Sequence, residues 1–129
     1  MSPSQGGPQT MRFMMIMMPN VPEEDWAPTP EAIAAMSKYN DELTKAGVLL
    51  GLDGLQPPAT GARVSFSGGT PTVTDGPFTE AKEMIGGYWL IQARSREEAV
   101  EWATRCPAAD GDVIEVRQVY ELSDYAGPE

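Results

Sequence analysis

Hydrophobic residues follow two different spacings along this chain, and the change from one to the other predicts its elements. Residues 11–18 form an almost unbroken apolar run that is too short for a stable helix and stops at Pro19. This run predicts a central strand that is covered on both faces. A helix follows, because Thr29 suits an N-cap, Pro30 suits the first helical position, and apolar residues then recur at steps of three and four. Gly47 stands where a left-handed residue ends such a helix.

The later elements follow from the same spacings and from local turn signals. Gly68 and Gly69 predict a tight hairpin turn, because glycine readily adopts a positive φ. Ser95 and Glu98 form a capping box that starts a second helix, which ends before Pro107. The predicted strands after the first are residues 48–55, 62–67, 70–74, 88–94 and 113–122.

The order strand, helix, strand, hairpin, strand, helix, strand predicts an α+β fold. We expect a ferredoxin-like split β-α-β arrangement with an inserted β-hairpin and with both helices on one face of the sheet. On the last strand, Glu115 and Arg117 share the side that points away from the helices with Val113, so this second face is mixed in character. We therefore expect a second copy to cover it, giving a homodimer in the form of a dimeric α/β barrel with charged residues in a cavity between the sheets.

Length and composition fit one domain. The chain has 129 residues, of which 41% are apolar, and that is enough for a single core. Residues 1–10 are small, polar and rich in Gly and Pro, which predicts a disordered N-terminal tail. The predicted organisation is this tail, a domain over residues 11–122 and a short C-terminal tail over residues 123–129.

The charge balance disfavours two classes of partner. Nineteen acidic and nine basic residues give a formal charge of −10, which repels both nucleic acids and anionic membranes. One cysteine, no leader-like segment and no apolar run of bilayer length predict a cytoplasmic protein. With one cysteine and no histidine the sequence offers no zinc site, and although carboxylates can bind magnesium or calcium, no ligand-loop spacing indicates such a site, so we expect no cofactor. Acid–base chemistry would have to use carboxylates, Lys, Tyr or Cys.

Asp75 is the leading candidate for chemistry. It ends a predicted strand and is followed by Gly76 and Pro77, so its position is set by the backbone, as a catalytic or binding group requires. The alternative is an Asx turn in which Asp75 bonds only its own loop. Glu80 and Lys82 follow within a few residues. They either add charge to the edge of a pocket formed around Asp75 or form a solvated charged turn.

Arg117, Glu115 and Arg63 are candidates for ligand binding. An Arg and a Glu two residues apart on one strand face must pair with each other or face a polar cavity, because an unpaired buried charge is costly. Arg63, on the predicted hairpin, could supply a second cation for an anionic ligand.

Three segments together resemble the DGPF branch of the YCII-related domain family: Thr-Asp-Gly-Pro-Phe-Thr-Glu-Ala-Lys-Glu at residues 74–83, Gly-Gly-Tyr at 86–88, and Ile-Glu-Val-Arg at 114–117. The resemblance implies a dimeric α+β barrel with a cleft between subunits where Asp75 would lie. Some relatives pair a His with an Asp for catalysis, and this chain has the Asp but no His. Genes of this branch often stand beside genes for extracytoplasmic-function sigma factors, which implies a regulatory role with such a partner.

Three functions remain open from the sequence. The first is a homodimer that binds a small polar or anionic ligand without turnover, in a role linked to a sigma factor. The second is a cofactor-independent isomerase, lyase or hydrolase in which Asp75 is the general acid–base. The third is an interaction module whose charged loop is only architectural.

Overall fold

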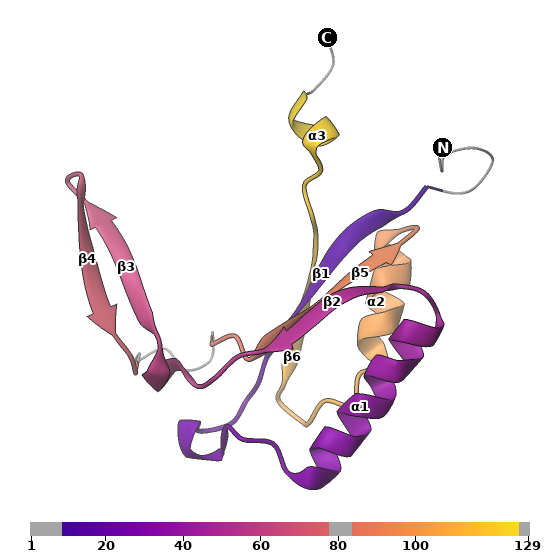
Figure 1. The fold of residues 1–129 in the computed structure, drawn as a ribbon, viewed down its shortest axis with the longest axis horizontal. Helices are drawn as coiled ribbons and strands as arrows, with labels where there is room; N and C mark the ends of the chain where they lie inside the picture. The colour runs from indigo at the N-terminus through magenta and orange to yellow at the C-terminus, as the bar shows by residue number, and fades with distance from the viewer. Residues whose placement is uncertain (1–8, 78–83, 127–129) are drawn as a thin grey trace.

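A computed structural model describes residues 9–77 and 84–126 of the chain. Its six strands and two long helices run in the predicted order, and two 3₁₀ turns and a short C-terminal helix were not predicted (Figure 1). They are β1 (Met11–Met18), the 3₁₀ turn η1 (Glu23–Asp25), α1 (Pro30–Lys45), β2 (Leu49–Gly54), the 3₁₀ turn η2 (Pro58–Thr60), β3 (Ala62–Ser67), β4 (Thr70–Asp75), β5 (Gly87–Ala93), α2 (Arg96–Thr104), β6 (Val113–Gln118) and α3 (Leu122–Ala126).

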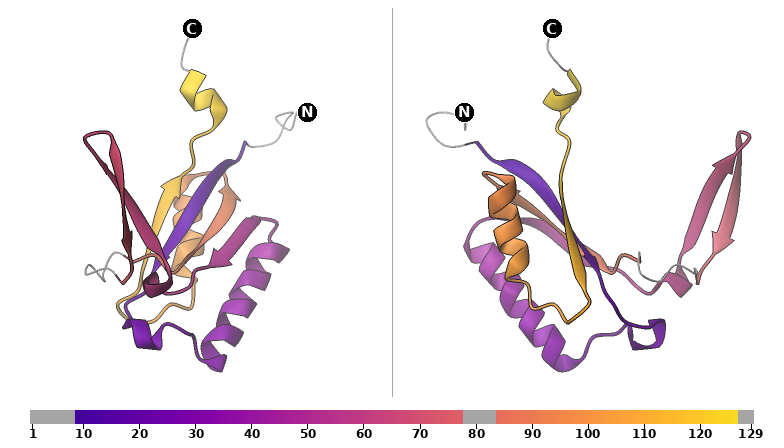
Figure 2. Two further views of the ribbon diagram at one scale, coloured as in Figure 1. Left: turned by 60° about the vertical axis from the view of Figure 1, so that its left-hand side comes forward. Right: turned by 180° about the vertical axis from the view of Figure 1, so that it is seen from behind.

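Four strands form one antiparallel sheet in the order β2-β5-β1-β6. Helices α1 and α2 each follow a strand and lead to another strand two places away, and both lie on the same face of the sheet (Figures 1 and 2). The α+β class is therefore confirmed, and the arrangement is compatible with a ferredoxin-like fold.

The core lies between this sheet and the two helices. Phe13 and Met15 of β1, Ile91 of β5 and Leu43 of α1 are the largest side chains that are fully buried. Alternate residues of β1 point to the opposite face, where Met14 is only partly buried. The chain itself thus covers one face of its central strand, whereas the apolar pattern of β1 predicts cover on both.

Helix α1 is fixed at its start and along its length by hydrogen bonds. The Thr29 hydroxyl accepts from the Ala32 amide at 3.1 Å, which confirms the predicted N-cap. Tyr39 donates to the Trp102 carbonyl at 2.7 Å, and Trp89 Nε1 donates to Asn40 Oδ1 at 2.8 Å. These two bonds join α1 to α2 and to the sheet.

Helix α2 begins at the predicted N-cap, but one bond of the capping box differs. The Ser95 hydroxyl accepts from the Glu98 amide at 3.0 Å. The Glu98 carboxylate accepts from the Arg94 amide at 2.6 Å, one residue before the N-cap that a standard box uses. This bond lowers the pKa of Glu98, because it stabilises the ionised form.

The last strand is shorter than the sequence predicts: β6 ends at Gln118, not at residue 122. Its neighbour β1 begins at Met11, and beyond the Phe13–Gln118 pair only the Val119 amide still bonds the Arg12 carbonyl, at 2.8 Å. Regular pairing with β1 thus ends close to the start of that strand, and the predicted boundary was wrong. The short helix α3 follows and takes up residues 122–126.

The chain after β6 is tied back to the start of β1 by an ion pair. Arg12 Nε lies 2.8 Å from Glu121 Oε2, and a second bond of 3.1 Å joins the same two side chains. The pairing raises the pKa of Arg12 and lowers the pKa of Glu121.

The hairpin of β3 and β4 confirms the prediction and extends away from the four-stranded sheet (Figures 1 and 2). Gly68 and Gly69 turn it with φ of 59° and 82°. Every residue of both strands is exposed, including Val64, Phe66 and Val73. The hairpin therefore presents apolar side chains outside the core of its own chain.

Among the described residues, none of the helices has both the length and the apolar character needed to span a bilayer.

Candidate functional site

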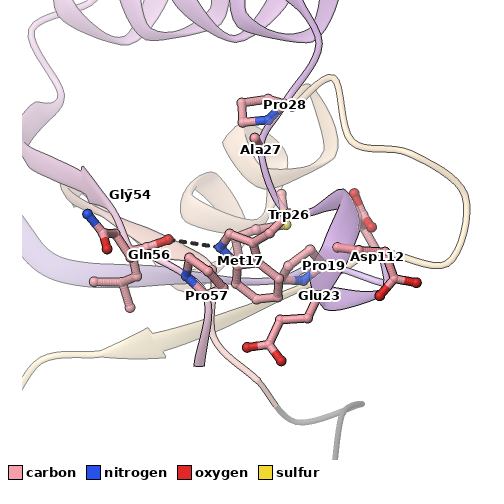
Figure 3. Close-up of a pocket in the computed structure, with 13 residues that line it drawn as sticks. Met17, Pro19, Glu23, Trp26, Ala27, Pro28, Gly54, Gln56, Pro57 and Asp112 are labelled. Atoms are coloured by element: carbon pink, nitrogen blue, oxygen red, sulfur yellow. Dashed lines mark hydrogen bonds between the residues drawn. The ribbon is translucent and has the colours of Figure 1, made fainter. Parts of the chain in front are cut away.

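A cleft of about 630 Å³ lies at the end of the sheet where β1 stops and β5 begins (Figure 3). One wall is the segment between β1 and α1, which includes η1, and the other is the segment that leaves β2. The lining residues are Met17, Pro19, Glu23, Glu24, Trp26, Ala27, Pro28, Gly54, Leu55, Gln56, Pro57, Gly86 and Asp112.

A second cavity of about 280 Å³ adjoins this cleft and extends towards α1. The two spaces share Met17, Gly54 and Gly86 as lining residues. Trp89 and Asp53 are among the residues that line only the second cavity. The two cavities therefore lie side by side around the ends of β1, β2 and β5.

Trp26 is the central aromatic side chain of the cleft. Its indole Nε1 donates to the Leu55 carbonyl at 2.9 Å, the dashed line in Figure 3, and this bond joins the two walls. Gly86 lies next to the indole ring of Trp26. A Cβ atom on Gly86 would be 3.5 Å from Trp26 Cζ2 and 2.9 Å from two side-chain atoms of Pro19. A glycine at position 86 thus allows Pro19 and the indole ring to approach the start of β5.

The charged side chains that line the cleft are Glu23, Glu24 and Asp112, all of them carboxylates. Glu23 accepts a hydrogen bond from the Ala59 amide. Asp112 accepts from the Asn20 amide at 2.8 Å and from the Ala109 amide at 3.0 Å. These bonds hold two of the three carboxylates in place at the rim.

The carboxylates do not converge on a point. Within residues 9–77 and 84–126, no three His, Cys, Asp or Glu side chains are grouped so that they could hold a metal ion. The cleft therefore presents negative charge that is spread around an apolar interior.

Tyr88 of β5 and Asp53 of β2 are opposite each other in the register and form a polar pair on the sheet face away from α1 and α2. The Tyr88 hydroxyl donates to Asp53 Oδ2 at 2.9 Å. This hydrogen bond raises the pKa of Tyr88, and the charge of Asp53 acts in the same direction. At neutral pH the phenol thus remains a hydrogen-bond donor.

Asp75 lies at the end of β4, opposite Ala62, and is exposed. The next residue, Gly76, donates its amide to the Gly61 carbonyl at 2.9 Å and packs against Pro58 in η2. Asp75 lines neither cavity, but its loop contacts the 3₁₀ turn that directly follows Pro57 of the cleft wall. Glu80 and Lys82 lie outside the described residues.

Glu115 and Arg117 pair with each other, as one of the two sequence alternatives requires. Arg117 NH1 lies 3.0 Å from Glu115 Oε2, and both side chains are exposed on the sheet face away from the helices. Arg63 is exposed on β3, opposite Thr74. None of these three lines either cavity, so the described chain does not gather the predicted ligand-binding residues around the cleft.

The sequence analysis missed the residues that form the cleft. Residues 19–28 are a Pro-rich connection between a predicted strand and a predicted helix, and they contain Trp26 next to Glu23, Glu24 and Asp25. An aromatic residue within an acidic, Pro-rich connection was the available signal, because such a side chain needs an apolar contact somewhere in the fold.

The fold and the cleft define a small α+β domain with a site of the size that suits a small molecule. The chain belongs to the YCII-related domain family, whose model matches residues 11–123. It is also 36% identical over 81 residues to an uncharacterised protein of Rhizobium meliloti (strain 1021). That match covers 63% of this chain and 62% of the relative's length. The finer assignment to the DGPF branch remains a prediction from the sequence.

Proposed function

We propose that the protein is a small-molecule-binding domain that acts as a homodimer. The observation that carries the proposal is the cleft of about 630 Å³ at the end of the sheet, with apolar walls and a few fixed polar groups. Clefts of roughly 300–1,000 Å³ with this composition are typical of small-ligand sites. The segment that lines one wall is joined to the other by the hydrogen bond from Trp26 to Leu55, so the site is largely preformed.

The homodimer is supported by the helix-free face of the sheet. Met14 and Leu90 are opposite each other in the register, as are Ile16 and Tyr88, and all four are only partly buried on the side away from α1 and α2. A sheet face with this many apolar groups is usually covered. A second copy packed on this face would form the dimeric α/β barrel that the family resemblance implies.

The hairpin provides a second reason for a dimer. A two-stranded hairpin is marginally stable by itself in water, and this one exposes Val64, Phe66 and Val73 at 52%, 75% and 65%. Packing against a second copy would bury these side chains. The same contact would place the loop of Asp75 near the interface between subunits.

Native mass spectrometry of protein purified from its own host tests both parts of the proposal. The expected result is a dimer that retains a small-molecule mass at gentle activation. A protein that is monomeric at micromolar concentration would overturn the homodimer. If no mass is retained and no metabolite of a broad panel raises the melting temperature, ligand binding is wrong.

Catalysis by Asp75 is the second candidate function. Its backbone is fixed by the β4 ladder and by the Gly76–Gly61 hydrogen bond, while its carboxylate is open to solvent and substrate. Once a ligand is identified, an Asp75→Asn variant tests this role, since the amide cannot accept or donate the proton. Unchanged turnover would exclude Asp75 as the general acid–base.

A regulatory partnership with an extracytoplasmic-function sigma factor remains the proposal implied by the family resemblance, and it would place the protein in the cytoplasm. Co-purification of the two proteins, with and without the retained ligand, tests it. Absence of a complex in both conditions would remove this role.

A further inference from the structure

The charged residues that line the cleft and its adjoining cavity all have the same sign. Glu23, Glu24 and Asp112 line the first space, and among the described residues that line either space there is no Lys or Arg. The chain as a whole carries a formal charge of −10, which adds to the negative potential of the cleft. An anionic ligand would be repelled here, whereas a cation would be attracted.

The interior of the cleft is apolar and contains an indole ring in a fixed position. Met17, Pro19, Leu55 and Pro57 surround Trp26, whose Nε1 bond to the Leu55 carbonyl restricts rotation of the ring. Indole is the strongest cation–π partner among the natural side chains. The ring therefore favours a cationic group, whereas the apolar side chains around it favour a ligand with an apolar body.

The carboxylates retain capacity to accept hydrogen bonds. An ionised carboxylate has about four lone-pair sites. Glu23 and Asp112 use some of theirs on backbone amides, and Glu24 makes no hydrogen bond within the described part of the chain. Because these groups are dispersed and do not form a metal-binding cluster in that part, they suit a cation whose charge is spread over a larger group.

From these features we infer that the cleft binds a small organic cation, a protonated or quaternary amine carried on an apolar body. The inference rests on the proposed function and names the ligand class for the same site. It replaces, for this cleft, the anionic ligand that Arg63 and Arg117 predict from the sequence, because neither residue lines it.

Three probes that share a six-carbon chain test the ligand class with the full-length protein: hexyltrimethylammonium, hexanol and hexanoate, by isothermal titration calorimetry. The cation is expected to bind roughly tenfold more tightly than the alcohol, and hexanoate more weakly than either. Equal affinity for cation and alcohol, or tighter binding of hexanoate, would overturn the cationic class but leave a small-molecule site. If none of the three binds, the proposed function fails for this cleft.

A pair of variants on one turn locates the binding. Glu24→Gln is expected to weaken hexyltrimethylammonium binding roughly threefold to tenfold and to leave hexanol unchanged. Asp25→Asn is the matched control, because Asp25 lies on the same turn η1 but does not line the cleft. If both variants weaken the cation equally, the attraction comes from the general surface charge and the cleft site is wrong. Urea unfolding of both variants, with equal midpoints expected, excludes an effect of misfolding.

Discussion

Gly76 lies so close to Pro58 that a Cβ atom on the glycine would be 2.0 Å from the Pro58 carbonyl oxygen and 2.8 Å from its carbonyl carbon. Both atoms belong to the backbone of η2, so they cannot move aside as the end of a flexible side chain could. The Gly76 amide also donates to the Gly61 carbonyl at 2.9 Å. The glycine of the sequence motif is therefore required by packing where the hairpin meets the turn beside the cleft.

A Gly76→Ala variant is expected to destabilise the fold, because either η2 or the base of the hairpin must shift. Overpacking of this kind costs about 1–3 kcal/mol in the free energy of unfolding. Urea unfolding followed by circular dichroism measures the loss. Gly51→Ala is the matched control, since nothing lies within 4 Å of a Cβ at Gly51 and its φ is not positive. Equal stability of the two variants would contradict the close contact.

The helix-free face gives a prediction about assembly. Ile16 lies on this face of β1, opposite Tyr88, so an Ile16→Glu variant would place an unpaired carboxylate in the proposed dimer interface. The dimer dissociation constant is expected to rise by roughly a hundredfold or more, because burying such a charge is costly. Analytical ultracentrifugation over a concentration series measures this shift.

Ile33→Glu provides the control for that variant, because Ile33 is 55% exposed on α1, away from the sheet face. The same substitution there is expected to leave the dimer intact. Dimers of equal strength in both variants would show that the interface lies elsewhere.

Most elements could be predicted because their signals are local. The run of residues 11–18 became β1 with the same limits, and the Thr29 and Ser95 caps start the two long helices. The end of β6 was missed because it is set by a partner far away in the sequence. The strand ends opposite Phe13, close to the start of β1, and no pattern within residues 113–122 shows this.

The site was harder to predict than the fold for the same reason. Asp75 stands in a recognisable motif, and the pairing of Glu115 with Arg117 follows from their spacing on one strand. The cleft instead combines four separate segments, which carry Met17 with Trp26, Leu55, Gly86 and Asp112. Such a combination depends on the strand order of the sheet, which periodicity alone does not reveal.

Cys106 provides a test of packing at the end of α2. The thiol is half-buried, and burial together with the nearby charge of Asp112 raises its pKa to about 11 from 9.0. Because the folded pKa is the higher one, this group favours the native state below pH 9.0, and the contribution is lost as the pH rises towards 11. Reaction with iodoacetamide is expected to be slow at pH 8 in the native protein and to accelerate near pH 11. In urea-unfolded protein the acceleration should come near pH 9; the same profile in both states would contradict the burial.

Glu98 should make the stability of α2 depend on acid. The Arg94 amide donates to its carboxylate at 2.6 Å, and the Arg94 guanidinium adds a bond of 3.3 Å, so the pKa of Glu98 is lowered from 4.5 in the folded state. The stabilisation is therefore present above pH 4.5 and is lost as the pH falls through the folded pKa. Glu98→Gln keeps an oxygen that can accept from the Arg94 amide but removes the charge, so it is expected to cost about 0.3–1 kcal/mol at pH 7, the usual size of a charge near a helix N-terminus, and much less at pH 3.

Glu97→Gln is the matched control for Glu98, because the neighbouring Glu97 side chain is 80% exposed and lies 3.8 Å from Arg96 in a surface ion pair. Exposed pairs of this kind contribute little to stability, so the control variant should unfold like the parent protein at both pH values. Urea unfolding at pH 7 and pH 3 separates the two carboxylates. A loss for Glu98→Gln that is the same at pH 3 as at pH 7 would show that the side chain acts through packing rather than through its charged hydrogen bond to Arg94.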